Sequence, residues 1–169
     1  MKPTILIVHG PMAAGKSTIT SQLEKELDDF LFVDRAYIKN VMLSKLKDRE
    51  LAKELSKKTV YLIMKGLMQQ RKNIMLQEQR APSVKKKLEK DIKKYRYRVI
   101  SFYLQCSVET AKKRDVKRQK RYVRPRRVEL MHEKHGYADP GDILIDTEKN
   151  SIKQTVNIIK TYMRKKNLL

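Results

Sequence analysis

Residues 10–18 read GPMAAGKST and combine glycine, lysine and hydroxyl side chains at the spacing G-x-x-x-x-G-K-[ST]. Gly10 and Gly15 permit backbone turns that residues with a Cβ avoid, so main-chain N–H groups can point inward around an anion. Lys16 carries a positive charge for the outer phosphates, and the Ser17 hydroxyl is a ligand for Mg²⁺. The spacing therefore predicts a loop that binds the triphosphate of ATP or GTP. Its residues are Gly10, Pro11, Met12, Ala13, Ala14, Gly15, Lys16, Ser17 and Thr18.

Such a loop needs a strand before it and a helix after it, and the flanking sequence predicts both. The run TILIV at 4–8 is short, apolar and rich in β-branched residues, which is typical of a buried strand in a parallel sheet. Ile19, Leu23 and Leu27 recur every four residues and predict an amphipathic helix over 17–27. The first N–H groups of that helix would add to the anion site.

The same two patterns alternate along the rest of the chain. Apolar runs predict further strands over 30–34, 73–76, 98–104 and 142–146. Helical spacing predicts helices over 36–47, 50–71, 83–95, 110–121, 127–134 and 151–163. This alternation is typical of an α/β fold in three layers, with a five-stranded, mostly parallel sheet. Because 169 residues fill one core, we expect residues 1–169 to form a single domain.

Positive charge dominates the composition. The net charge is +21, and residues 82–135 alone hold 19 basic and 6 acidic side chains. Such a field favours polyanions, so we expect nucleic acid as a possible partner through residues 82–135, or phosphorylated small molecules. No run approaches the roughly 20 apolar residues of a membrane span, and the first residues lack the features of a signal peptide. We therefore expect a cytoplasmic protein with no membrane partner.

Several segments together resemble the small P-loop kinases. They are the motif GPMAAGKST, the strand FLFVD with YIK after it, and the late strand DILIDT. Within these kinases, the chain is most similar to the group of polynucleotide 5′-kinases, zeta toxins, chloramphenicol phosphotransferase and gluconate-type kinases. The resemblance implies a P-loop NTPase domain with a basic lid, ATP and Mg²⁺ as cofactors, and transfer of the γ-phosphate to an acceptor hydroxyl.

The resemblance also implies two carboxylates. In the family, an Asp after the second strand contacts the acceptor hydroxyl and acts as base, often within D-x-x-R. Aligning the basic position with Lys39 places Ala36 where that Asp is expected, so Asp34 is the nearest candidate; the alternative is that Asp34 caps a helix. In the family, the third strand often ends in an Asp that acts on Mg²⁺ through water, or on substrate. Here Gln77 takes that place, and Glu78 is the nearest candidate for the metal.

A lid in such kinases supplies arginines to the phosphates, and residues 114–135 are its candidate here. Arg114, Arg118 and Arg121 would share one helical face, and a basic connection follows them. Arginine forks match phosphate oxygens, so we expect the lid to bind the transferred phosphoryl group. The alternative is a solvated basic helix. The arginines proposed for the lid are Arg118, Arg121 and Arg124.

These residues lead to three functional hypotheses. The first is an ATP-dependent phosphotransferase acting on an anionic acceptor, such as a nucleic-acid end, a nucleotide or a sugar phosphate. The second is a nucleotide-regulated nucleic-acid-binding ATPase without kinase activity, which the departures at Ala36 and Gln77 motivate. The third is a structural partner that keeps a nucleotide site only for stability.

Overall fold

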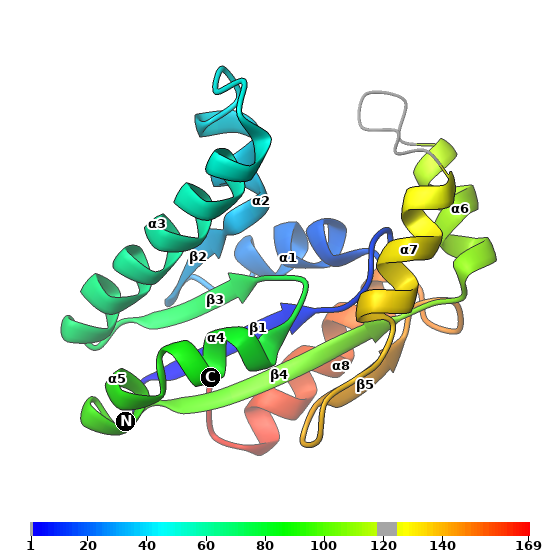
Figure 1. The fold of residues 1–169 in the computed structure, drawn as a ribbon. Helices are drawn as coiled ribbons and strands as arrows, with labels where there is room; N and C mark the ends of the chain where they lie inside the picture. The colour runs from blue at the N-terminus through cyan, green and yellow to red at the C-terminus, as the bar shows by residue number, and fades with distance from the viewer. Residues whose placement is uncertain (1, 118–124) are drawn as a thin grey trace.

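Five strands form the centre of the structure, a computed structural model that describes residues 2–117 and 125–169 (Figure 1). The strands are β1 (Thr4–His9), β2 (Phe30–Asp34), β3 (Asn73–Gln77), β4 (Arg98–Gln105) and β5 (Ile143–Asp146). They lie in the order β2-β3-β1-β4-β5, and all four pairings are parallel. The predicted five-stranded α/β sheet is therefore confirmed, and the loop-bearing strand β1 is its central strand.

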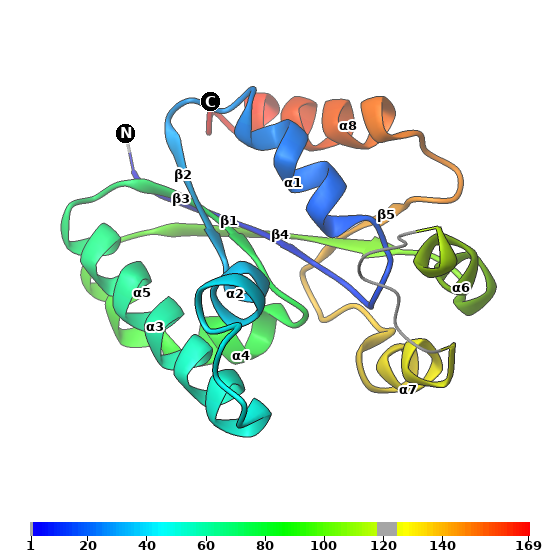
Figure 2. The same ribbon diagram turned by 90° about the horizontal axis from the view of Figure 1, so that it is seen from above.

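Helices cover both faces of this sheet (Figure 2). They are α1 (Lys16–Glu24), α2 (Arg35–Tyr37), the π-helical turn η1 (Ile38–Met42), α3 (Arg49–Gln69), α4 (Ala81–Lys87), α5 (Glu89–Lys94), α6 (Val108–Val116), α7 (Pro125–His135) and α8 (Ile152–Lys165). Among the residues that the structure describes, no helix combines the length and the apolar character needed to cross a membrane.

The alternating side chains of β1 explain the three layers. Leu6 and Val8 join a buried cluster with residues of α1 and α8, and Ile5 and Ile7 join another with residues of α3 and α4. Successive residues of a strand point to opposite faces, so a wholly apolar strand needs helices on both sides. The edge strands are less covered, and Leu31 and Leu144 are exposed.

Two helices predicted as continuous are divided in the structure. In place of the helix predicted over 36–47, the structure has α2 and then η1, which ends at Met42, and Leu43 N–H donates to Ile38 O at 3.0 Å across five residues. Residues 83–95 form α4 and α5, separated at Leu88. The φ of Leu88 is −103° and its ψ is 9°, yet its side chain is fully buried. Packing of the side chain into the core thus overrides the local preference for one unbroken helix.

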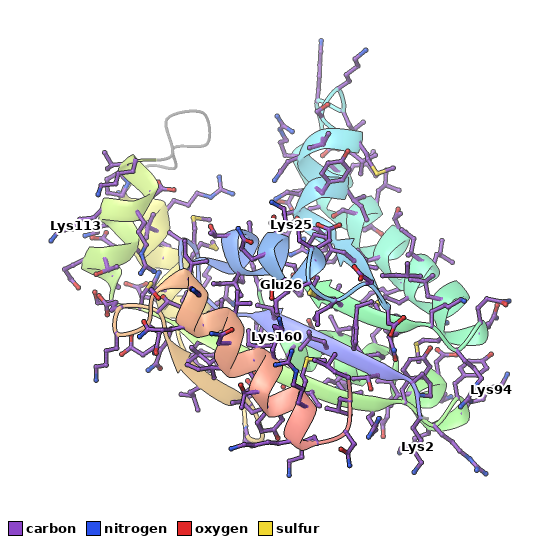
Figure 3. The ribbon with its side chains drawn as sticks, turned by 180° about the vertical axis from the view of Figure 1, so that it is seen from behind. Lys2, Lys25, Glu26, Lys94, Lys113 and Lys160 are labelled. Atoms are coloured by element: carbon purple, nitrogen blue, oxygen red, sulfur yellow. The ribbon has the colours of Figure 1, made fainter. Side chains whose placement is uncertain are left out.

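The described part of the basic segment 82–135, which leaves out residues 118–124, is spread over both ends of the molecule. It includes α5, near the amino ends of the strands, and α6 and α7, beyond the carboxyl ends (Figure 1). Figure 3 shows Lys94 and Lys113 at opposite ends of the molecule. Other elements are basic as well: Lys160 of α8 pairs with Glu26, which follows α1. An anion would therefore bind at a local cluster of cations rather than along this segment as a whole.

Candidate functional site

The predicted triphosphate loop connects β1 to α1 at the carboxyl edge of the sheet (Figure 1). Three of its residues have positive φ: 141° at Gly10, 61° at Ala13 and 94° at Gly15. Left-handed residues among right-handed ones direct successive N–H groups toward one concave side, which attracts anions. Lys16 Nζ donates to Gly10 O at 2.8 Å and to Pro11 O at 2.6 Å, so its ammonium group is held against the loop.

The start of α1 also fits a bound triphosphate and its Mg²⁺. Gly15 caps this helix without a side-chain hydrogen bond, and the first turn holds no acidic residue. No carboxylate of that turn therefore offsets the partial positive charge of the helix N-terminus. Ser17 and Thr18 expose their side chains in the same turn. The N–H groups and hydroxyl side chains at this end of α1 are therefore suited to binding phosphate oxygens and Mg²⁺.

Gly10→Ala tests how closely the loop approaches β4. A Cβ on Gly10 would lie 2.2 Å from Leu104 O, and the φ of 141° is unfavourable for other residues. We expect this substitution to lower the free energy of unfolding by about 2 to 4 kcal/mol, measured by urea denaturation. Gly66→Ala in α3 is the control, because its Cβ would meet no atom within 4 Å, and it should raise stability by up to about 1 kcal/mol. Equal effects would contradict the close approach.

Two helices after β4 support the loop from outside. His132 of α7 is buried, and its Nε2 lies 2.9 Å from Met12 O. Ala13 packs in a small apolar cluster with Ala111 of α6 and Val128 of α7. The region predicted as a lid therefore contacts the phosphate loop directly.

The arginines of the candidate lid segment 114–135 include the three proposed for the lid and Arg114, which precedes them. Arg118, Arg121 and Arg124 lie outside the described residues, so their role stays a prediction. Arg114 Nη1 donates to Thr147 Oγ1 at 2.8 Å, and its Nη2 donates to Thr147 O at 2.6 Å. These two bonds attach α6 to the turn after β5, which is a structural role for Arg114.

Asp34 lies at the same edge of the sheet as the loop. In the strand register it is paired with Gln77 of β3, which is paired in turn with Val8 of β1. With strands about 4.8 Å apart, the backbones of Asp34 and Val8 are about 10 Å apart. Gln77 is buried and accepts a hydrogen bond from Thr20 Oγ1 at 2.7 Å. It therefore links β3 to α1 at the position where the resemblance to small P-loop kinases predicts an acidic residue.

The Asp34 side chain caps α2, which was the alternative to a functional role. Its Oδ1 accepts the Ala36 N–H at 2.7 Å. Burial raises the pKa of the Asp34 carboxyl above its ordinary value, and the negative charge of Glu78 adds to the rise. Hydrogen bonds from Ala36 N–H, Tyr37 N–H and Gln77 offset only part of it. A carboxylate with a raised pKa is a stronger proton acceptor, so capping and base chemistry are compatible here.

Glu78 is engaged by a neighbouring arginine. Arg35 Nε donates to Glu78 Oε2 at 2.6 Å, and Arg35 Nη2 donates to Oε1 at 2.7 Å. The Gln79 N–H also donates to Oε1, at 2.8 Å. The two charged side chains are only 14% and 9% exposed, so this two-point ion pair is sheltered from water. The predicted metal contact by Glu78 stays a prediction, because the carboxylate is already engaged by Arg35 and Gln79 and keeps acceptor capacity only on its remaining lone pairs.

Five cations, which we call the Lys39 cluster, gather at the same edge: Arg35, Lys39, Arg49, Lys53 and Arg127. Burial lowers the pKa of the Lys39 ammonium, and the charges of the other four lower it further. Arg127 belongs to α7, whereas the other four belong to α2, η1 and α3 across the carboxyl edge (Figures 1 and 2). Within the described residues, Lys39, Arg49 and Arg127 take part in no ion pair. Such uncompensated repulsion favours a bound anion.

Comparison with known proteins shows the family. The model of the zeta toxin family matches residues 1–168. The chain belongs to the zeta toxin family. This membership confirms the predicted resemblance to the group of small P-loop kinases that includes the zeta toxins. Among curated proteins, no match to this zeta toxin family member is found.

Solved structures share the fold of this zeta toxin family member at low sequence identity. A protein from Chloroflexus aurantiacus described as a candidate kinase has a TM-score of 0.78 at 18% identity, with 97% of each chain covered. A gluconokinase from Sinorhizobium meliloti has a TM-score of 0.66 at 12% identity, with 92% of this chain and 89% of that chain covered. A chain of a Pnkp1/Rnl/Hen1 RNA repair complex has a TM-score of 0.67 at 19% identity, with 80% of this chain and 44% of that chain covered. These likenesses establish the P-loop kinase fold.

Arg35 and His132 are among the residues of this site that sequence reasoning missed. Arg35 directly follows Asp34 at the end of a predicted strand, but its ion pair with Glu78 depends on β2 lying beside β3. His132 contacts Met12 O from a helix 120 residues further along the chain. A basic residue at a strand end was the only local signal for Arg35, and none was present for His132.

Proposed function

We propose that this member of the zeta toxin family is an ATP-dependent kinase that transfers the γ-phosphate to a hydroxyl of an anionic acceptor. The observation that carries the proposal is the position of Asp34. Its carboxyl, with a raised pKa, lies at the sheet edge that also presents the loop around Lys16. When bound, ATP supplies the phosphoryl group and Mg²⁺ neutralises part of its charge.

The chain's own residues would divide the work as follows. Loop N–H groups and Lys16 bind the outer phosphates, and the Ser17 hydroxyl holds Mg²⁺. Asp34 orients the acceptor hydroxyl and accepts its proton at a carboxylate oxygen, while the Ala36 N–H keeps the other oxygen in place. Arg118, Arg121 and Arg124 are proposed to close over the phosphates and exclude water.

The Lys39 cluster supports an anionic acceptor. Charged hydrogen bonds contribute about 1.5 to 3 kcal/mol each, so Lys39→Gln and Arg127→Gln should each raise the acceptor KM about tenfold or more. The KM for ATP should stay unchanged, because neither side chain belongs to the phosphate loop. Lys94→Gln removes a cation from α5 at the far end of the molecule and serves as the control (Figure 3). An unchanged acceptor KM in both cluster variants would exclude this role.

The function itself is tested by transfer of radiolabelled phosphate from ATP to three acceptor classes: nucleic-acid 5′ ends, nucleotides and sugar phosphates. Stable label on one class supports the kinase and identifies its acceptor. ATP turnover with salt-sensitive RNA or DNA binding and no labelled acceptor would instead support the nucleic-acid-binding ATPase. Thermal stabilisation by Mg-ATP without any turnover would support the structural partner.

A further inference from the structure

A buried polar cluster lies beside the phosphate loop and has no part in the proposed reaction. His9, the last residue of β1, is 1% exposed and directly precedes Gly10. Its Nε2 lies 3.0 Å from Asp142 Oδ2, a close polar contact that does not have the geometry of a hydrogen bond. The Asp142 side chain is itself fully buried. Burying two ionisable groups costs free energy unless other groups compensate them. The partners of His9 and Asp142 therefore indicate which parts of the structure the pair holds together.

The partners of Asp142 come from three segments. Ser101 Oγ of β4 donates to Asp142 Oδ1, and Lys85 Nζ of α4 lies 3.5 Å from the same oxygen. Lys85 Nζ also donates to Ser101 Oγ at 2.7 Å, and the Asp139 N–H donates to Asp142 Oδ2 at 2.8 Å. Burial alone would raise the pKa of Asp142, but these bonds and the nearby charges hold it below its usual value. Asp142 is therefore a carboxylate at neutral pH.

The neighbours of His9 determine which nitrogen carries the proton. The Ala81 N–H, at the start of α4, points to His9 Nδ1 at 3.4 Å. A ring nitrogen that faces a donor acts as acceptor, so the proton is on Nε2 and faces Asp142. The Tyr103 ring packs edge-on against the imidazole, with centroids 5.3 Å apart. Burial lowers the pKa of His9 more than Asp142 raises it, so the ring is neutral at pH 7.

A metal ion is the competing explanation for this cluster. Three potential ligand atoms lie within 4.8 Å of one another, one each from His9, Asp139 and Asp142. Two features of the structure oppose a metal ion there. The Lys85 ammonium lies 3.5 Å from Asp142 Oδ1. The Ala81 N–H faces His9 Nδ1, so Nδ1 is the acceptor and the tautomer inferred from this contact has a proton, not a lone pair, on Nε2.

We propose that His9 is a positioning residue that fixes the end of β1, and with it the phosphate loop, to α4 and to the segment between α7 and β5. The two partners of its ring belong to these segments. Ala81 follows the connection that carries Glu78, and Asp142 follows α7, which contacts Met12 through His132. One buried imidazole thus joins the three parts that must keep their relative positions when a triphosphate is bound. The inference rests on the loop's role in the proposed function.

Calorimetry with Mg-ATP, in the absence of any acceptor, tests this inference. His9→Ala should raise the Kd about tenfold or more, whereas His9→Gln, which keeps an N–H toward Asp142, should stay close to the wild type. Tyr97→Phe is the matched control: Tyr97 is buried, and the substitution removes its partly buried hydrogen bond to Lys72 O, 2.7 Å long, at the amino edge of the sheet. It should lower stability without changing the Kd. A normal Kd in a folded His9→Ala variant, or an equal rise in Tyr97→Phe, would overturn the positioning role.

The pH dependence gives a second readout if His9→Ala does not fold. In acid, a proton on His9 Nδ1 would place two N–H groups, those of His9 and Ala81, against each other. Because this repulsion would disturb the position of the loop, the Kd of the wild type for Mg-ATP should rise more steeply in acid than the Kd of His9→Gln. The charged groups near the ring, Asp142, Asp139 and Lys85, are the same in both proteins. Identical pH profiles, or a stoichiometric metal that is lost in His9→Gln, would overturn the inference. Absence of every kinase activity would contradict the proposed function but would leave these binding results unaffected.

Discussion

Lys16→Ala is expected to lower kcat/KM for phosphoryl transfer about a thousandfold or more. The substitution removes the only ammonium group within the loop sequence and its bonds to Gly10 O and Pro11 O. In a site sheltered from water, a fixed charge directed at developing negative charge stabilises the transition state by several kcal/mol. Steady-state transfer of labelled phosphate measures the loss, and calorimetry with Mg-ATP separates weaker binding from slower chemistry.

Lys25→Ala is the matched control for this prediction. Lys25 is exposed at the other end of α1, so its loss changes the net charge equally without touching the loop (Figure 3). We expect its activity to equal that of the wild type. Transfer by Lys16→Ala within tenfold of the wild type would show that the loop does not have the role given to it here.

Asp34→Asn is expected to lower kcat about a hundredfold to ten-thousandfold, with little change in the KM for ATP. Asparagine caps a helix as well as aspartate does, so it can keep the bond from the Ala36 N–H while losing the ability to accept a proton. Asp48→Asn is the control. Asp48 caps α3 by accepting the N–H groups of Glu50 and Leu51 at 3.0 and 2.9 Å, and its substitution should leave kcat unchanged.

The dependence of kcat/KM on pH also tests whether Asp34 is the base. Because protonated Asp34 is not a base, kcat/KM of the wild type should fall as the pH falls through its raised pKa. This acid limb should lie at higher pH than for an exposed aspartate, and Asp34→Asn should lack it. If Glu78→Gln abolished transfer while Asp34→Asn did not, Glu78 would be the base instead.

The strands and the phosphate loop could be predicted because their signals are local. The runs at 4–8, 30–34 and 98–104 are apolar over a few residues, and each lies in a strand of the sheet. The loop motif needs only its own spacing and its two neighbours. By contrast, the local patterns predict continuous helices over 36–47 and 83–95, which the structure divides. For 83–95, no local pattern reveals that Leu88 must reach the core.

Amino-acid order by itself determined a triphosphate loop between a buried strand and a helix, and the α/β class that surrounds it. The tertiary structure decided which distant residues meet at that loop. The strand order places Gln77 between Asp34 and β1, pairs Glu78 with Arg35, and brings Arg127 within electrostatic reach of Lys39. Hydrophobic periodicity is set by neighbours within a few positions. Charge pairing and burial instead depend on residues far apart in the chain, which only the packed sheet brings together.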